Sequence, residues 1–266
     1  MRIESKFKEL KQKNKAALVT YITAGDPDLK TTPVLVSELE KNGADIIELG
    51  IPFSDPVADG PAIQLASERA LKNGATIKTV LKTIVEIRKT SDIPIILFGY
   101  YNPFYKYGLG KFAKDAKQAG ADGVLVIDLP PEESEEFRQY LKNEKLDLVF
   151  LLAPTSTTER IKLVSKFASG FIYLVSVTGV TGERPKLDYS LESLIQEIVK
   201  YSNLPLGVGF GVSSSEQVDK ISSIADAVIV GSALVKIIEK NGYNIEVLLK
   251  EMGDFIKKLS NACYRN

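Results

Sequence analysis

The chain has 266 residues, of which 44% are hydrophobic and 26% are charged, as in ordinary water-soluble globular proteins. Its 34 basic residues balance 34 acidic ones, so no net charge draws it to nucleic acid or to an anionic membrane. It has no histidine and one cysteine, Cys263, which excludes His-based catalytic triads, metal sites built from His or Cys, and a disulfide framework.

The N-terminal stretch MRIESKFKELKQKNK is charged and lacks the apolar core of a signal peptide. Apolar runs such as GVLVI are too short to span a bilayer. We therefore expect a cytoplasmic protein. If it is an enzyme, its proton transfers must use carboxylates, Tyr, Lys or water.

Short apolar runs recur along the chain and predict β-strands. Most are nearly continuous in apolar residues, which is typical of parallel strands that are buried on both faces. The predicted strands are Ala17–Thr23, Asp45–Leu49, Pro94–Phe98, Gly123–Ile127, Leu146–Leu152, Gly170–Val175, Pro205–Gly209 and Ala227–Val230.

Segments with helical spacing of apolar residues lie between these runs. They are Thr31–Asn42, Ile77–Lys89, Lys111–Ala119, Glu132–Asn143, Thr158–Phe167, Leu191–Tyr201, Ser215–Ser222 and Ser232–Lys240. An amphipathic segment, Ile3–Gln12, precedes the first strand, and Asn244–Ala262 is expected to form the last helix.

This alternation predicts an α/β fold, a single (β/α)8 barrel domain over residues 1–266 with an extra N-terminal helix. The stretches KNGADIIELG, QAGADGVLVIDLP and SSIADAVIVG form a weak internal repeat, as expected of units that stack side by side. No GxGxxG follows the first strand, where an open dinucleotide-binding sheet would carry it. We expect the extra helix to close the bottom of the barrel.

The stretch ELGIPFSDPVADGP places Glu48 near the end of the second strand and Asp59 in the loop that follows. Catalytic residues of (β/α)8 barrels lie where strands end, at the carboxyl-terminal face. Three prolines limit the motion of this loop. The alternative is structural: Glu48 would pair with a Lys or Arg, and Asp59 would cap a helix that begins near Pro61.

The stretches SVTGVTGERP, GVGFGVSS and IVGSAL follow or contain the last three strands, and each combines glycine with a hydroxyl residue. Glycine lets backbone N–H groups approach an oxyanion, and a helix N-terminus adds positive partial charge. Together these loops predict a phosphate site, although glycines of this kind also serve tight turns alone. GVTGERPK is interpreted as a mobile lid or, equally, as a surface loop.

Aromatic residues follow the third strand in LFGYYNPFYKYG, where most of the rings are expected to pack in the outer layer. Phe210 and Tyr173 are better candidates for the walls of a pocket, because each lies near the carboxyl end of a predicted strand.

Together these stretches resemble the α subunit of tryptophan synthase. The resemblance rests on ELGIPFSDPVADGP together with TAGDP, YYNP, DLPPEES, SVTGVTG, GVGFGVS and IVGSA, in the family's order along the chain. It implies a (β/α)8 barrel that cleaves indole-3-glycerol phosphate into indole and glyceraldehyde 3-phosphate by a retro-aldol reaction. It also implies that this chain needs no cofactor. The partner, a β subunit in an α2β2 complex, uses pyridoxal phosphate to join indole to serine for tryptophan biosynthesis.

The resemblance assigns catalytic roles to Glu48 as the main acid and base, to Asp59 facing the indole N–H, and to Tyr173 near the glycerol hydroxyl. It places the indole ring among Tyr21, Phe98, Leu125 and Phe210, and the phosphate group on Gly182, Gly211, Gly231 and Ser232. In the lid, Thr181 matches a threonine that contacts the catalytic aspartate when the lid closes.

The chain departs from the family pattern in two places. The lid TGERPKLDYS is shorter than in enterobacterial relatives, and Tyr21 stands where some relatives have Phe. Both loops that would face a β subunit, SDPVADG and YYNPFYKYG, are present.

Three alternatives remain. The chain could be a free-standing indole-3-glycerol phosphate lyase of the same family, without a partner. It could be another phosphosugar barrel enzyme, but no predicted strand ends in the lysine that such enzymes use. It could be a non-catalytic barrel that serves as a partner subunit, in which case the acidic pair or the phosphate glycines should have been lost.

Overall fold

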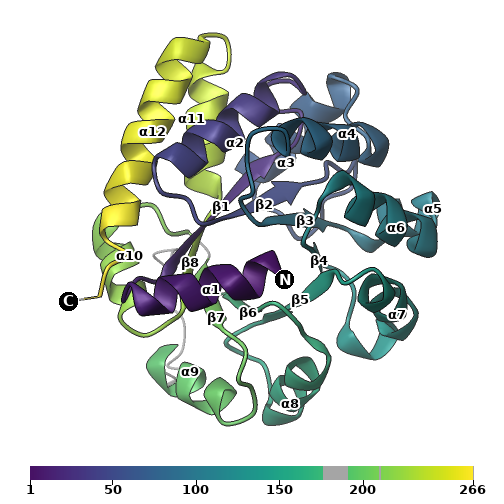
Figure 1. Cartoon of the computed structure of the whole chain (residues 1–266), viewed down its shortest axis with the longest axis vertical. Helices are drawn as coiled ribbons and strands as arrows, with labels where there is room; N and C mark the ends of the chain where they lie inside the picture. The colour runs from purple at the N-terminus through teal and green to yellow at the C-terminus, as the bar shows by residue number, and fades with distance from the viewer. Residues whose placement is uncertain (176–190, 210, 266) are drawn as a thin grey trace.

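The computed structural model describes residues 1–175, 191–209 and 211–265. Eight parallel strands close into a barrel in chain order, and β8 pairs with β1 through Ala17 and Ala227 (Figure 1). The strands are β1 (Ala17–Thr23), β2 (Ile46–Gly50), β3 (Ile95–Gly99), β4 (Gly123–Val126), β5 (Asp147–Leu152), β6 (Ile172–Val175), β7 (Leu206–Gly209) and β8 (Ala227–Val230). The predicted (β/α)8 barrel is therefore confirmed.

Helices surround the barrel, and those with an apolar stripe turn it toward the strands. They are α1 (Arg2–Gln12), α2 (Thr31–Lys41), α3 (Pro61–Lys72), α4 (Ile77–Ile87), α5 (Tyr101–Tyr107), α6 (Leu109–Ala119), α7 (Glu135–Asn143), α8 (Thr158–Phe167), α9 (Leu191–Val199), α10 (Ser215–Ser222), α11 (Ser232–Asn241) and α12 (Ile245–Asn261). A 3-10 turn, η1 (Pro131–Glu133), precedes α7.

Helix α5 corrects the prediction of a loop after the third strand. The backbone N–H of Tyr101 is held by Oδ1 of Asp128 at 2.7 Å, which fixes the start of the helix. Phe104 is fully buried, and its ring lies 4.6 Å from that of Phe112 and 5.8 Å from that of Phe137. Pro103 falls in the first turn, where a missing N–H costs little. Tertiary packing of the aromatic rings therefore makes a helix of this segment.

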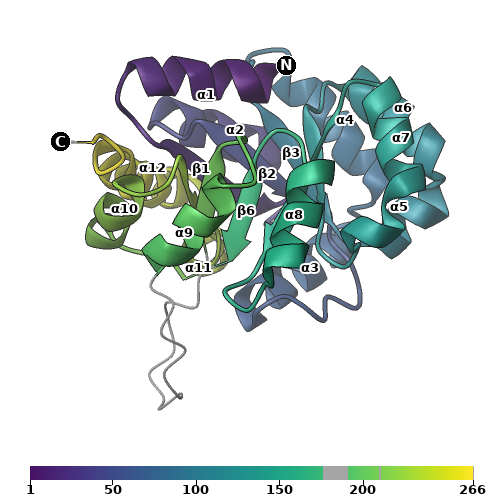
Figure 2. The same cartoon turned by 90° about the horizontal axis from the view of Figure 1, so that it is seen from below.

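Helix α1 closes the end of the barrel at which the strands begin, as expected. Ile3, Phe7 and Leu10 are buried in the same cluster as the side chains inside the barrel, and the ring of Phe7 lies 5.9 Å from that of Phe171. Figure 2 shows α1 on one side of the strands and α3, which follows the carboxyl end of β2, on the other. The opposite end of the barrel, where the strands end, is not covered by α1. We call it the mouth, and it is the place to look for a functional site.

Candidate active site

Glu48 lies at the mouth, on the penultimate residue of β2, and is 1% exposed. Its Oε1 has no hydrogen-bond partner among the residues that the structure describes, so the predicted alternative of a pairing with Lys or Arg is not found there. Burial raises the pKa of this carboxyl from 4.5 to about 8, because a charge is poorly solvated inside the barrel. At neutral pH the side chain is mostly protonated and can donate a proton.

Asp59 is half-buried in the loop between β2 and α3. It does not cap α3, whose N-cap is Gly60. Its Oδ2 accepts a hydrogen bond of 3.1 Å from the hydroxyl of Tyr100, and its backbone oxygen accepts one of 2.8 Å from Gln64. Burial raises the pKa of Asp59 to about 6, and the Tyr100 hydroxyl partly offsets this by stabilising the ionised form. At neutral pH Asp59 is mostly ionised.

The predicted apolar walls come together inside the barrel. Tyr21, Phe98, Leu125 and Tyr173 belong to one buried cluster, although they come from β1, β3, β4 and β6. The ring of Tyr21 meets that of Phe98 edge to face, with 5.2 Å between the centroids. Partly buried Ile63, Ile127, Leu151 and Val175 pack against the same cluster; the sequence analysis did not single them out.

Two strand glycines make room for the tyrosine hydroxyls. A Cβ atom at Gly50 would collide with the hydroxyl of Tyr21, which bonds Oγ1 of Thr23 at 3.2 Å. A Cβ atom at Gly209 would lie 2.7 Å from the hydroxyl of Tyr173. Burial, with a smaller contribution from Glu48, raises the pKa of Tyr173 well above 10, so it remains a neutral hydrogen-bond donor near Glu48.

The predicted phosphate residues lie partly within the described structure. Gly211 follows β7 with a left-handed φ of +75°, which a glycine adopts without strain. Gly231 and Ser232 form the N-terminus of α11, and no side chain from the described residues caps it. A Cβ atom at Gly231 would lie 3.3 Å from that of Tyr21, so this helix end adjoins the apolar cluster. Its N–H groups remain available for an anion.

Three predicted site residues, Thr181, Gly182 and Phe210, lie outside the described residues, as does the predicted lid. Tyr100 is a residue of the site that the sequence analysis missed. Its position directly after the third strand is a signal that could have identified it.

The carboxyl end of β4, β5 and β6 borders a hollow of about 450 Å³, lined in part by Ile127, Leu151 and Val175. Within the described residues, no group of three or more His, Cys, Asp or Glu side chains could hold a metal ion. No helix in that part of the chain is long and apolar enough to cross a membrane.

A closed parallel barrel that carries a protonated and an ionised carboxyl beside aromatic rings at its mouth is typical of (β/α)8-barrel enzymes that use carboxylate acid–base catalysis. Comparison with known proteins narrows this class. The sequence model of the family described as tryptophan synthase alpha chain matches residues 7–264.

A tryptophan synthase alpha chain from Geotalea uraniireducens is 51% identical, over 97% of this chain and 96% of the relative. A solved structure from Aquifex aeolicus has a TM-score of 0.89 at 44% identity, covering 100% of this chain and 99% of the other. Tryptophan synthase subunit alpha from Legionella pneumophila has a TM-score of 0.88 at 38% identity, covering 98% of each chain. The chain belongs to the tryptophan synthase alpha chain family, whose lyase activity is the cleavage of indole-3-glycerol phosphate.

Proposed function

We propose that Glu48, Asp59 and Tyr173 carry out the retro-aldol cleavage of indole-3-glycerol phosphate to indole and glyceraldehyde 3-phosphate. The observation that carries the proposal is the state of Glu48, a buried carboxyl at a strand end with a free oxygen and a pKa raised to about 8. Such a group is protonated at neutral pH and can both donate and accept a proton during one turnover.

In the first step Glu48 donates its proton to C3 of the indole ring. The ring loses its aromaticity, and positive charge develops at the ring nitrogen. Asp59, ionised at neutral pH because its pKa is about 6, accepts the N–H hydrogen bond and stabilises this charge. The opposite protonation states of the two carboxyls therefore match the two roles.

In the second step the hydroxyl group on the carbon attached to C3 loses its proton to the Glu48 carboxylate. The bond between that carbon and C3 breaks, an aldehyde forms, and the electron pair returns to the ring and restores neutral indole. Glu48 is protonated again, so the cycle consumes no external proton. Tyr173, neutral and near Glu48, orients the hydroxyl by a hydrogen bond.

The binding roles of the other residues follow from their positions. Tyr21, Phe98 and Leu125 hold the indole ring, since they line one apolar cluster. The N–H groups at Gly231 and Ser232, with Gly211, hold the phosphate group. The roles expected of Thr181, Gly182 and Phe210 stay predictions.

The proposal includes a cytoplasmic location and a tryptophan synthase β subunit as partner in an α2β2 complex. The β subunit takes up the indole and supplies the pyridoxal phosphate, while this chain works without a cofactor. Support comes from the family and from exposed apolar side chains beside the mouth, Val57 at 86% and Tyr105 at 63% exposure.

The test is to follow indole release from indole-3-glycerol phosphate by the purified chain, alone and with a bacterial β subunit. We expect slow release alone, faster release with the partner, and loss of both in Glu48→Gln. Fast release that the β subunit leaves unchanged would identify a free-standing lyase instead. No release from folded protein under either condition would contradict the catalytic proposal and favour a non-catalytic partner subunit.

A further inference from the structure

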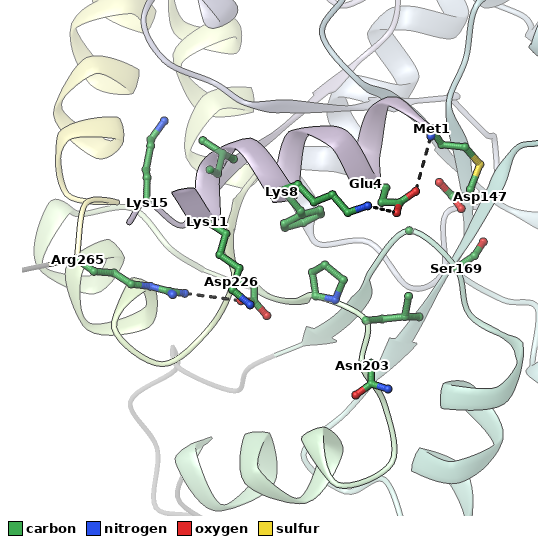
Figure 3. Close-up of a pocket in the computed structure, with 15 residues that line it drawn as sticks. Met1, Glu4, Lys8, Lys11, Lys15, Asp147, Ser169, Asn203, Asp226 and Arg265 are labelled. Atoms are coloured by element: carbon green, nitrogen blue, oxygen red, sulfur yellow. Dashed lines mark hydrogen bonds and ion pairs between the residues drawn. The ribbon is translucent and has the colours of Figure 1, made fainter. Parts of the chain in front are cut away.

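A second cavity, of about 520 Å³, lies at the end of the barrel opposite the mouth, between α1 and the segments that lead into β5, β6, β7 and β8. We call it the basal cavity. Its apolar walls include Phe7, Leu10, Leu204 and Pro205, and its polar groups include Asp147 (Figure 3). This volume falls within the range of pockets that hold small molecules.

Asp147 differs from the other aspartates that stand at the starts of strands. Oδ2 of Asp45 accepts the N–H of Leu18 at 2.8 Å, which joins the start of β2 to β1. Oδ2 of Asp122 accepts the N–H of Ile95 at 3.0 Å in the same manner, and Oδ2 of Asp226 accepts the N–H of Leu206 at 3.0 Å. These three carboxylates tie neighbouring strands together.

Neither carboxyl oxygen of Asp147 has a hydrogen-bond partner in the described part of the chain, although the residue is 1% exposed. Buried carboxyl oxygens without partners are rare in folded proteins, because nothing compensates for the loss of their hydration. Burial accordingly raises the pKa of Asp147, and the nearby Ser169 hydroxyl and N-terminal amine offset this only in part. The side chain lies beneath Met1 in Figure 3, among the lining residues of the basal cavity.

The other acidic groups that line the basal cavity are already paired. Glu4 bonds Lys8 at 2.6 Å and lies 3.8 Å from the N-terminal amine, and Asp226 lies 3.8 Å from Arg265. Lys11 extends from α1 toward the Arg265 side of the cavity, away from Asp147 (Figure 3). Among the described acidic residues that line the cavity, Asp147 is the one with neither an ion pair within 4 Å nor a hydrogen bond, so the ligand it suits is a cation.

An organic cation suits this site better than a metal ion does. A metal ion needs several carboxylate or similar ligands, and the described residues offer no group of three. A primary ammonium group, in contrast, has three N–H donors and can satisfy both oxygens of one carboxylate. The apolar walls beside Asp147 suit a hydrocarbon or aromatic body attached to it.

We propose that the basal cavity binds a small molecule with a primary ammonium group on an apolar or aromatic body. The ammonium group donates to the carboxylate of Asp147, and the body packs between Phe7 of α1 and Pro205 before β7. A bound cation favours the ionised carboxylate, so binding also removes the cost of the unpaired oxygens. The site is separate from the mouth, since the barrel interior lies between them.

The probe is phenethylamine, and its control is 2-phenylethanol, which has the same body with a hydroxyl in place of the ammonium group. Titration calorimetry should show binding of the amine about ten- to a hundred-fold tighter than that of the alcohol. Asp147→Asn, which keeps the shape of the side chain, should reduce amine affinity to that of the alcohol. Asp59→Asn, a matched change at the mouth, should leave it unaltered.

Amide resonances of the unaltered protein give a second readout that does not depend on a variant's folding. The amine should shift the resonances of Ser169 and Gly170, which line the basal cavity, and leave that of Gly231 in place. Equal affinity for amine and alcohol, unchanged affinity in Asp147→Asn, or no saturable binding would overturn the proposal. Loss of binding in Asp59→Asn, or a shift at Gly231 alone, would place the amine at the mouth and also overturn it.

Discussion

The hydroxyl of Tyr100 donates a hydrogen bond of 3.1 Å to Oδ2 of Asp59 and accepts one of 3.0 Å from the backbone N–H of Ala58. One side chain at the end of β3 therefore holds both the carboxyl group and the backbone of the loop after β2. The ring of Tyr100 also lies 5.3 Å from that of Phe53, at the other end of the loop. These contacts fix the position of the Asp59 carboxyl group within the loop.

Tyr100→Phe removes both hydrogen bonds and keeps the ring. Because the hydroxyl stabilises the ionised form of Asp59, its loss should raise the pKa of Asp59 further above 6. We expect kcat/KM at pH 7 to fall about tenfold and the acidic limb of its pH profile to move up by about one unit. A uniform loss of activity at every pH, with no movement of that limb, would contradict a role through Asp59.

The two perturbed carboxyls predict a bell-shaped pH dependence of kcat/KM. Activity should rise as Asp59 ionises near pH 6 and fall as Glu48 loses its proton near pH 8. In Asp59→Asn the acidic limb of the profile should disappear. The remaining rate of indole release should be at least about a hundred-fold lower than that of the original chain. The measurement is the rate of indole release between pH 5 and pH 9, with enzyme stability checked at each pH. A profile that is flat over pH 6–8 and falls in neither direction would exclude these roles.

The alternation of eight apolar runs with helical segments was enough to predict the barrel. Nearly continuous apolar runs are typical of parallel strands that helices cover. The position of Glu48 was predictable for a similar reason, since it falls near the end of an apolar run that forms a strand. Tyr100 was not, because its role depends on where the loop carrying Asp59 lies in three dimensions. Asp147 resembles Asp45 and Asp226 in sequence position, and only the hydrogen bonds distinguish them.

Glu48→Gln should stabilise the protein at neutral and alkaline pH while it abolishes catalysis. The folded state holds the Glu48 proton up to about pH 8, whereas the unfolded chain releases it near pH 4.5. The folded protein therefore loses stability progressively as pH rises from 4.5 to 8, and the total loss amounts to a few kcal/mol. Because glutamine does not ionise, the variant does not lose stability in this way as the pH rises.

Urea unfolding at pH 5 and at pH 8 measures this effect. The variant should be of similar stability to the original chain at pH 5 and clearly more stable at pH 8. If the variant and the original chain were equally stable at pH 5 and also at pH 8, Glu48 would have a partner for its charge in the folded protein. Glu9, a partly exposed carboxyl whose pKa is lowered to about 2 by Lys13 and Lys6, provides the control, because Glu9→Gln should not stabilise the protein at either pH.

Gly209→Ala tests the space around Tyr173. The added Cβ would lie 2.7 Å from the Tyr173 hydroxyl and 2.7 Å from Cβ of Ile229, so the backbone of β7 or the tyrosine must move. We expect a loss of stability of about 1–3 kcal/mol and a larger loss of kcat than of substrate affinity. Gly60→Ala is the stability control, because no heavy atom lies within 4 Å of its Cβ position. Equal stability of the two variants would contradict the packing argument.

The surface beside the mouth should carry the contact with a β subunit. Val57 lies in the loop that Tyr100 holds, and Tyr105 lies on α5, which begins one residue after Tyr100. A partner that packs on both segments would therefore act directly on the position of Asp59. Tyr105→Asp places a charge in this apolar surface, and we expect it to weaken activation by the β subunit about tenfold while indole release by the chain alone is unchanged.

Tyr243→Asp is the matched control. Tyr243 is fully exposed in the connection between α11 and α12. The same charge there should leave activation intact, because Tyr243 belongs neither to the loop carrying Asp59 nor to α5. Titration of each variant with the β subunit, with indole release as the readout, separates the two surfaces. If Tyr243→Asp weakened activation and Tyr105→Asp did not, the partner would bind beside α11 and α12, and the proposed contact through Val57 and Tyr105 would be contradicted.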